Sequence, residues 1–154
     1  INNGTCQMKI TTLATALTFW PFFASADVTV SDGWARASIP ASHPAAAYLK
    51  LMSYQNDQLI GDNTPVADNV TIHAVETDAD GVSRMIEIDA LDLASVEPVT
   101  LAPGGMHLML MSMSVKLEEG ADLQLTMTFA SGARMEVNVP VLGPGAMGSQ
   151  EQQP

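Results

Sequence analysis

Apolar residues in the central part of the chain recur at every second position, and this period constrains the fold more than any other feature. Val70, Ile72 and Ala74, for example, alternate with Thr71, His73 and Val75. A period of two is typical of a half-buried strand, whereas no stretch shows the sustained 3.6-residue period of an amphipathic helix. Seven or so short strands predict a single-domain, all-β antiparallel β-sandwich. They are expected at 28–30, 45–52, 70–75, 83–88, 106–113, 123–129 and 135–141.

Turn-forming residues separate the expected strands. The run from Ala130 to Ala133 lies between two alternating segments and predicts a tight hairpin turn. Clusters of Gly, Pro, Asp, Asn and Glu mark further turns at 61–63, 78–81, 103–105 and 118–120.

The N-terminal 26 residues have the organisation of a secretory signal peptide. A short basic start at Met8-Lys9 precedes a mostly apolar run, and Ala24-Ser25-Ala26 provides a small-x-small cleavage site. The run is too short for a membrane-spanning helix, so no membrane insertion is expected after cleavage. Residues 1–7 are interpreted as an upstream extension of the reading frame, and whether they are translated stays open.

The expected mature chain is one domain at 27–142 followed by a tail at 143–154. This tail is rich in Gly, Pro, Gln and Ser and is predicted to be disordered. Cys6 is the only cysteine, so the mature chain has no thiol for a nucleophile, an iron–sulfur site or a His₂Cys copper centre. Lys9 leaves with the signal peptide, so 5 basic residues against 17 acidic ones give a net charge of −12. Such a surface disfavours nucleic acid and anionic lipid as partners.

Two histidines and two methionines form the most informative constellation in the chain: His73, Met85, His107 and Met109. Imidazole nitrogen and thioether sulfur form a soft, neutral ligand set, and thioether selects Cu(I) over hard cations. Residues i and i+2 of a strand share a face, so His107 and Met109 project together. A hairpin at 78–81 would bring His73 beside Met85. The four residues are therefore candidate metal ligands.

Each of these residue types also has an ordinary structural role. A methionine in a strand is commonly flexible core filling, as interpreted here for Met52, Met111, Met113 and Met127. His43 lies in a loop and is expected not to bind metal. The pattern shows no acid, base or nucleophile arranged for catalysis, so the protein is expected not to be an enzyme.

The spacing His-x₁₁-Met-x₂₁-His-x-Met resembles that of the periplasmic copper chaperone family called PCu(A)C. The resemblance covers residues 28–141 and extends to the text around the motif. The matching segments are Gly33-Trp34-Ala35-Arg36, Ala45-Ala46-Ala47-Tyr48-Leu49, Gly81-Val82-Ser83-Arg84-Met85 and the run from Leu101 to Met111.

This resemblance implies a cupredoxin-like fold and one copper ion, chiefly Cu(I), bound by His73, Met85, His107 and Met109. It also implies a bacterial periplasmic protein that delivers copper to cytochrome c oxidase copper centres or their assembly factors. Two departures stand out. Ala74 replaces a methionine that many relatives carry after the first histidine, and the tail offers only Met147 toward a second site.

Three other functions share parts of this pattern. A periplasmic copper sequestration or resistance protein would need the same site without a dedicated acceptor. A small copper oxidase of the sandwich class would need a substrate pocket, and a metal-free adhesion module would make the His/Met spacing a coincidence. The identity of the acceptor, a CuA-type or CuB-type target, the resting oxidation state and the oligomeric state stay open.

Overall fold

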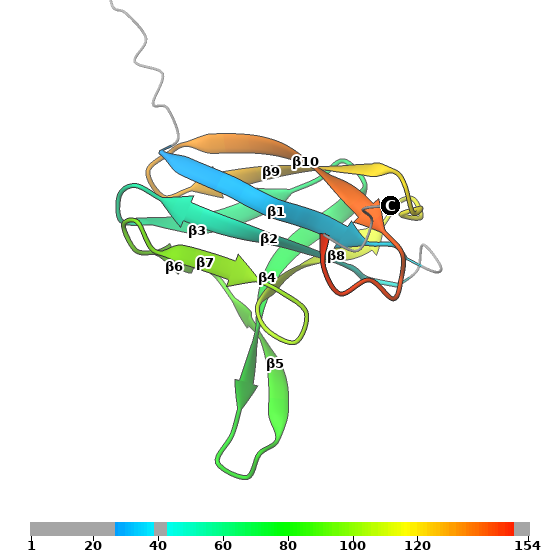
Figure 1. Cartoon of the computed structure of the whole chain (residues 1–154), viewed down its shortest axis with the longest axis horizontal. Helices are drawn as coiled ribbons and strands as arrows, with labels where there is room; N and C mark the ends of the chain where they lie inside the picture. The colour runs from blue at the N-terminus through cyan, green and yellow to red at the C-terminus, as the bar shows by residue number, and fades with distance from the viewer. Residues whose placement is uncertain (1–26, 39–42, 150–154) are drawn as a thin grey trace, which may run out of the picture.

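The alternating segments build one continuous β-sheet that closes on itself (Figure 1). The computed structural model describes residues 27–38 and 43–149. The strands, in chain order, are β1 (Val28–Arg36), β2 (Ala45–Ser53), β3 (Asp57–Asn63), β4 (Ala67–Thr77), β5 (Ser83–Ile88), β6 (Leu91–Leu93), β7 (Pro98–Leu101), β8 (His107–Met113), β9 (Asp122–Phe129) and β10 (Arg134–Leu142).

Seven of these strands form a barrel. They run in the order β4-β8-β2-β1-β10-β9-β3, and a pairing of β3 with β4 closes the ring. β5, β6 and β7 are added outside this ring, on β4, β3 and β2 respectively. β1 and β10 pair in parallel over Ala35↔Val141 and Arg36↔Leu142, whereas the other pairings between these strands are antiparallel.

The prediction of a single all-β domain is confirmed, but the sheet differs from the expected antiparallel sandwich. It is a mixed, closed barrel, because β10 returns alongside β1 in the same direction and β3 closes onto β4. Alternation along a strand reports which side faces the core, but it carries no information about which strand lies next to it. The closed arrangement therefore could not be read from the period alone.

The barrel interior is filled by aliphatic side chains from alternate strand positions. Leu51, Leu110, Leu125 and Met127 are each 0% exposed, and Phe129 is 1% exposed. Burying one such side chain contributes about 1.5–3 kcal/mol before the entropy of ordering is subtracted. A core of this kind holds the described part of the chain without a disulfide, because the only cysteine lies at position 6.

Three strands were not predicted: β3, β6 and β7. The turn expected at 61–63 lies inside β3, where the register with β9 shifts between Leu59 and Gly61. That irregularity and the charged Asp62 break the alternation that marks a strand. β6 is only three residues long, and β7 begins with Pro98.

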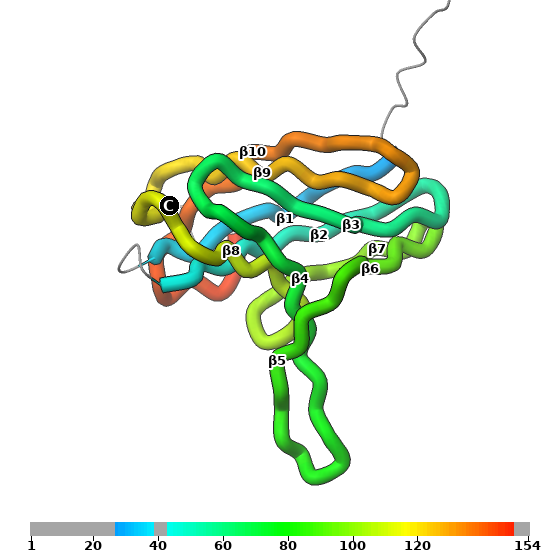
Figure 2. The backbone as a smooth tube through the Cα atoms, turned by 180° about the vertical axis from the view of Figure 1, so that it is seen from behind, coloured from blue at the N-terminus to red at the C-terminus, as the bar shows by residue number. Residues whose placement is uncertain are grey.

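The hairpin turn predicted at 130–133 is confirmed, with Phe129 N–H bonded to the Ala133 carbonyl at 2.9 Å. Its Gly132 has a φ of 88°, a conformation that costs glycine little and other residues much more. The 78–81 turn also forms and joins β4 to β5. That hairpin projects well away from the barrel (Figures 1 and 2).

The predicted signal peptide at 1–26 lies outside the described residues, as does 150–154 of the predicted tail. The first part of that tail is described and contacts the barrel. The Ala146 carbonyl accepts a hydrogen bond of 2.8 Å from Arg36 Nη2, and Ala146 packs against Trp34 and Tyr48. Within 27–38 and 43–149, no helix is long and apolar enough to span a bilayer.

Candidate metal centre

The two predicted histidine ligands face each other across neighbouring strands. His73 of β4 and His107 of β8 are direct cross-strand partners, and their ring centroids lie 5.7 Å apart. Directly opposed residues of an antiparallel pair point to the same side of the sheet. The fold therefore brings together two imidazoles from strands that are separated in the chain by β5, β6 and β7.

His107 is held in place by the turn before it. The imidazole is buried, at 6% exposure, and its Nδ1 lies 3.0 Å from the carbonyl oxygen of Gly105. A carbonyl only accepts, so Nδ1 carries the proton and donates. The lone pair of the neutral ring then resides on Nε2. A second-shell carbonyl that fixes the tautomer in this way is a common feature of metal-ligating histidines.

His73 has no hydrogen-bond partner at either ring nitrogen. Its Nδ1 is buried and unpartnered, and its Nε2 lies 3.8 Å from Glu87 Oε2, beyond hydrogen-bond distance. The side chain is 16% exposed. An imidazole that is largely removed from water and has no partner is destabilising unless something binds it. The residue thus has the capacity to ligate.

The two methionines lie on the same face as the histidines, but on opposite sides of the pair. Met109 is opposite Thr71 and Met85 is opposite Val75, each two positions from His73 along β4. Measured along β4, the two methionines are four positions apart, which is about 13 Å at ~3.3 Å per residue. Met109 is half-buried and follows His107 by two residues, whereas Met85 is 52% exposed on the projecting hairpin.

The hairpin was expected to place Met85 beside His73, but it places Met85 two positions farther along the strand. Glu87 is the direct partner of His73, and Met85 lies diagonal to it on the same face. Diagonal neighbours are within reach of a long side chain. His73, His107 and Met109 form a compact group, and Met85 is the outlying member. Ala74 pairs with Ile86 on the opposite face, as expected, and His43 is exposed.

Aromatic side chains outside the His/Met motif extend the histidine pair sideways across the neighbouring strands. Trp34 and Tyr48 are cross-strand partners with centroids 4.5 Å apart, and the Tyr48 ring lies 6.3 Å from that of His107. Arg36 covers both aromatic rings at 5.8 and 5.6 Å. Period-two alternation could have placed Glu87 with Met85 on one face. Nothing in the sequence could have placed Tyr48 next to His107, because that contact depends on strand order.

The donor set fits a soft metal. Among residues 27–38 and 43–149, no three His, Cys, Asp or Glu side chains come together as a metal cluster, so a hard-ligand site is not built around the histidine pair. The available donors are two neutral nitrogens and two thioethers, which favour Cu(I). Glu87 is the nearest carboxylate to His73, and its side chain is 60% exposed.

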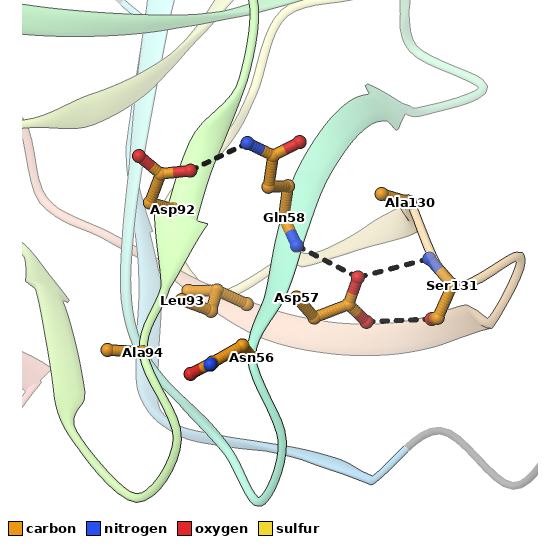
Figure 3. A pocket seen from close by; sticks show the side chains of 8 residues that line it. All are labelled: Asn56, Asp57, Gln58, Asp92, Leu93, Ala94, Ala130 and Ser131. Atoms are coloured by element: carbon orange, nitrogen blue, oxygen red, sulfur yellow. Dashed lines mark hydrogen bonds between the residues drawn. The ribbon is translucent and has the colours of Figure 1, made fainter.

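A cavity of about 560 Å³, drawn in Figure 3, is lined by none of the four candidate ligands. Its polar groups already have partners: Gln58 donates to Asp92, and Asp57 accepts from the Ser131 hydroxyl and backbone. Desolvation acts to raise the pKa of Asp57, but the bonds from Ser131 and the Gln58 N–H outweigh it and hold that pKa below its usual value. Both carboxylates of this cavity are therefore already engaged in hydrogen bonds. It is lined by Asn56, Asp57, Gln58, Asp92, Leu93, Ala94, Ala130 and Ser131.

Comparison with known proteins defines the class to which this fold belongs. The family model described as "Putative lipoprotein LpqE-like" matches residues 28–141. The chain is 29% identical over 115 residues to Putative lipoprotein Lxx21020 of Leifsonia xyli subsp. xyli, covering 74% of this chain and 69% of that protein.

Two solved structures share the fold. The apo PCuAC domain of PmoF2 matches with a TM-score of 0.67 at 25% identity, covering 82% of this chain and 98% of that domain. The Cu(I) form of DR1885 from Deinococcus radiodurans matches with a TM-score of 0.58 at 27% identity, covering 71% and 74%. The chain therefore belongs to the LpqE-like, or PCuAC, family, as the resemblance in the motif predicted.

Proposed function

We propose that the protein is a copper chaperone that holds one Cu(I) ion on His73, Met85, His107 and Met109. The observation that carries this proposal is the direct pairing of two imidazoles with uncommitted nitrogens, flanked on the same face by two methionines. The related DR1885 structure is of the Cu(I) form, which supports the same oxidation state here.

The ligands differ in how they are held, and this difference suits a carrier whose cargo must leave. His107 is buried and oriented by the Gly105 carbonyl, so it is preorganised. Met85 lies on the exposed hairpin, so it is the ligand that an acceptor can displace first. Neutral nitrogen and thioether ligands hold Cu(I) less firmly than thiolates. Copper can then pass to an acceptor with softer ligands without a change in oxidation state.

We place the protein in the bacterial cell envelope, on the periplasmic side. The signal peptide predicted at 1–26 and the name of the Leifsonia relative as a lipoprotein support export. In an oxidising compartment thioether ligands form no disulfides, although they can oxidise to sulfoxide. The role requires no bond-making in a substrate, and we assign the protein no catalytic activity.

The acceptors that we propose are the copper centres of cytochrome c oxidase or their assembly factors. A copper sequestration protein would use the same four ligands, but it would not hand its copper on. The exposure of Met85 on a projecting hairpin favours delivery over storage, because an acceptor can reach an exposed ligand directly.

The test is a Cu(I) transfer experiment on the mature chain. Cu(I)-loaded protein is mixed with the apo form of a soluble dithiolate copper domain from an oxidase subunit, and the copper on each protein is measured after separation. We expect near-complete transfer within minutes. Retention of copper by this chain, despite a tighter acceptor, would instead indicate sequestration. Equal binding of Zn(II) and Cu(I) in competition would contradict the four-ligand site itself.

A further inference from the structure

The barrel is closed by a single residue pair, Asp62 of β3 with Val70 of β4. On one side of this pair residues 64–66 connect the two strands, and no further pairing of β3 with β4 occurs there. Asn63 pairs with Thr126 of β9, whereas Ala67 pairs with Met113 of β8. Figure 2 shows the connection turning back from β3 to β4 at this end of the barrel. This connection and the strand ends beside it line a cavity of about 90 Å³, here called the seam cavity. It is lined by Asp62, Asn63, Thr64, Ala67, Asp68, Asn69 and Val70.

Asp62 brings an unpartnered carboxylate to the seam cavity. Both of its oxygens are buried and accept no hydrogen bond. Its cross-strand partners, Val70 and Met127, are apolar and buried. Burial raises the pKa of Asp62 to about 7. An ionised carboxylate in such surroundings is costly unless a proton or a cation neutralises it.

Thr64 provides a second, independent unpartnered oxygen. Its side chain lines the same cavity and is only 3% exposed, and its Oγ1 is buried with no hydrogen-bond partner. Asp68, Asn63 and Asn69 add one carboxylate and two amide oxygens at the outer side of the cavity, where all three are exposed. The lining thus offers two carboxylates, two amides and a hydroxyl, but no imidazole, thiol or thioether. Such oxygen donors suit Ca²⁺, which takes six to eight, with water or backbone carbonyls completing the set.

The charge around Asp62 has one sign. Within the seam cavity the other charged residue is Asp68. Asp62 also borders a neighbouring hollow of about 300 Å³, where Glu87 and Asp89 of the β5 segment are the charged residues. The neighbouring positions of β9, Thr126 to Thr128, are uncharged. No basic side chain lines either space, so no charge of the protein itself neutralises Asp62 there.

We propose that the seam cavity binds a hard divalent cation of the calcium class, with Asp62, Asp68 and Thr64 among its ligands. The site is separate from the histidine–methionine centre, and it selects against copper because it offers oxygen alone. By joining the end of β3 to the start of β4, the ion stabilises the one-pair closure of the barrel. A site with two carboxylates and exposed amides fits an affinity in the range of extracellular calcium modules, a Kd on the order of 10⁻⁴–10⁻³ M.

The test is thermal unfolding of the copper-free mature chain with CaCl₂ against a chelator. At pH 8 and a free calcium concentration ten times Kd, we expect Tm to rise by about 4 °C. At pH 5 the rise should be smaller, because protons compete for Asp62. Asp62→Asn should abolish the calcium effect and Asp68→Asn should weaken it. Asp80→Asn, a matched change in the exposed 78–81 turn, should leave it intact.

Three results would overturn the proposal. One is a Tm that does not respond to calcium at pH 8, even when it depends on pH, since the cavity would then hold water and a proton only. Another is a calcium response that survives in Asp62→Asn. The third is an equal loss of response in Asp80→Asn, since calcium would then act on the surface charge as a whole. Titration calorimetry on Asp68→Asn keeps the test decisive if Asp62→Asn fails to fold.

Discussion

Met85 and Met127 are the same residue type in opposite surroundings, and their replacement by alanine separates a ligand from core filling. Met85 is 52% exposed on the projecting β5 strand, whereas Met127 is 0% exposed inside the barrel. Met85→Ala removes a side chain that is already about half exposed to solvent in the folded protein. We expect it to lower the free energy of unfolding of the apo protein by about 1 kcal/mol or less. Cu(I) affinity should nevertheless fall.

The loss of affinity in Met85→Ala has a lower bound. Second-shell changes at metal sites cost about 10–100-fold in affinity, so the loss of a direct ligand should cost at least about tenfold, or ~1.4 kcal/mol. The assay is competition with a chromophoric Cu(I) chelator under anaerobic conditions, paired with urea unfolding of the apo form.

Met127→Ala should show the reverse pattern. Truncating a fully buried methionine costs about 2–5 kcal/mol. For a domain of this size that lowers Tm by roughly 8–20 °C, while the Cu(I) affinity of the folded fraction is unchanged. The reasoning is refuted if Met85→Ala binds Cu(I) as tightly as the wild type. It is also refuted if Met127→Ala lowers the free energy of unfolding no more than Met85→Ala does.

Three further results are expected. Copper should raise the free energy of unfolding by about 4 kcal/mol at a free concentration 1,000 times Kd; calorimetry should show this increment vanishing in His107→Ala and persisting in the exposed His43→Ala. The folded-state pKa of Asp62 is raised from 3.8 to about 7, so protonation of this carboxyl favours the folded state. With a chelator present, the free energy of unfolding measured from pH 5 to 8 should therefore fall as pH rises through 7. Asp62→Asn should flatten that slope. Gly33→Ala would place a Cβ 2.6 Å from Val139 Cγ1, which should cost about 1–3 kcal/mol in urea unfolding, whereas Gly145→Ala, with no atom within 4 Å, should be neutral.

The sequence predicts the strands whose alternation is regular and misses those whose pattern is interrupted. β4 and β9 lie where apolar residues alternate, since each has one face on the core, and β8 was predicted from a continuous apolar run. β3 was not predicted because Asp62 stands where alternation would place an apolar residue. The strand is also irregular, since its register with β9 shifts between Leu59 and Gly61. Asp62, which breaks the alternation there, also lines the seam cavity.

The candidate ligands could be selected from the sequence, but their arrangement could not. The alternation rule correctly places His107 and Met109 on one face, because it concerns a single strand. The pairing of His73 with His107 joins β4 to β8, and neither hydropathy nor turn residues specify that neighbour. The hairpin register likewise puts Glu87, not Met85, opposite His73, because the length of the 78–82 connection determines the register.

The most direct test of the copper site is X-ray absorption on the mature chain loaded with one equivalent of Cu(I). The four-ligand account predicts a first shell with both sulfur and nitrogen scatterers, near two of each, and loss of sulfur signal in Met109→Ala. Copper bound through nitrogen and oxygen alone, or an unchanged sulfur signal in both Met85→Ala and Met109→Ala, would contradict it.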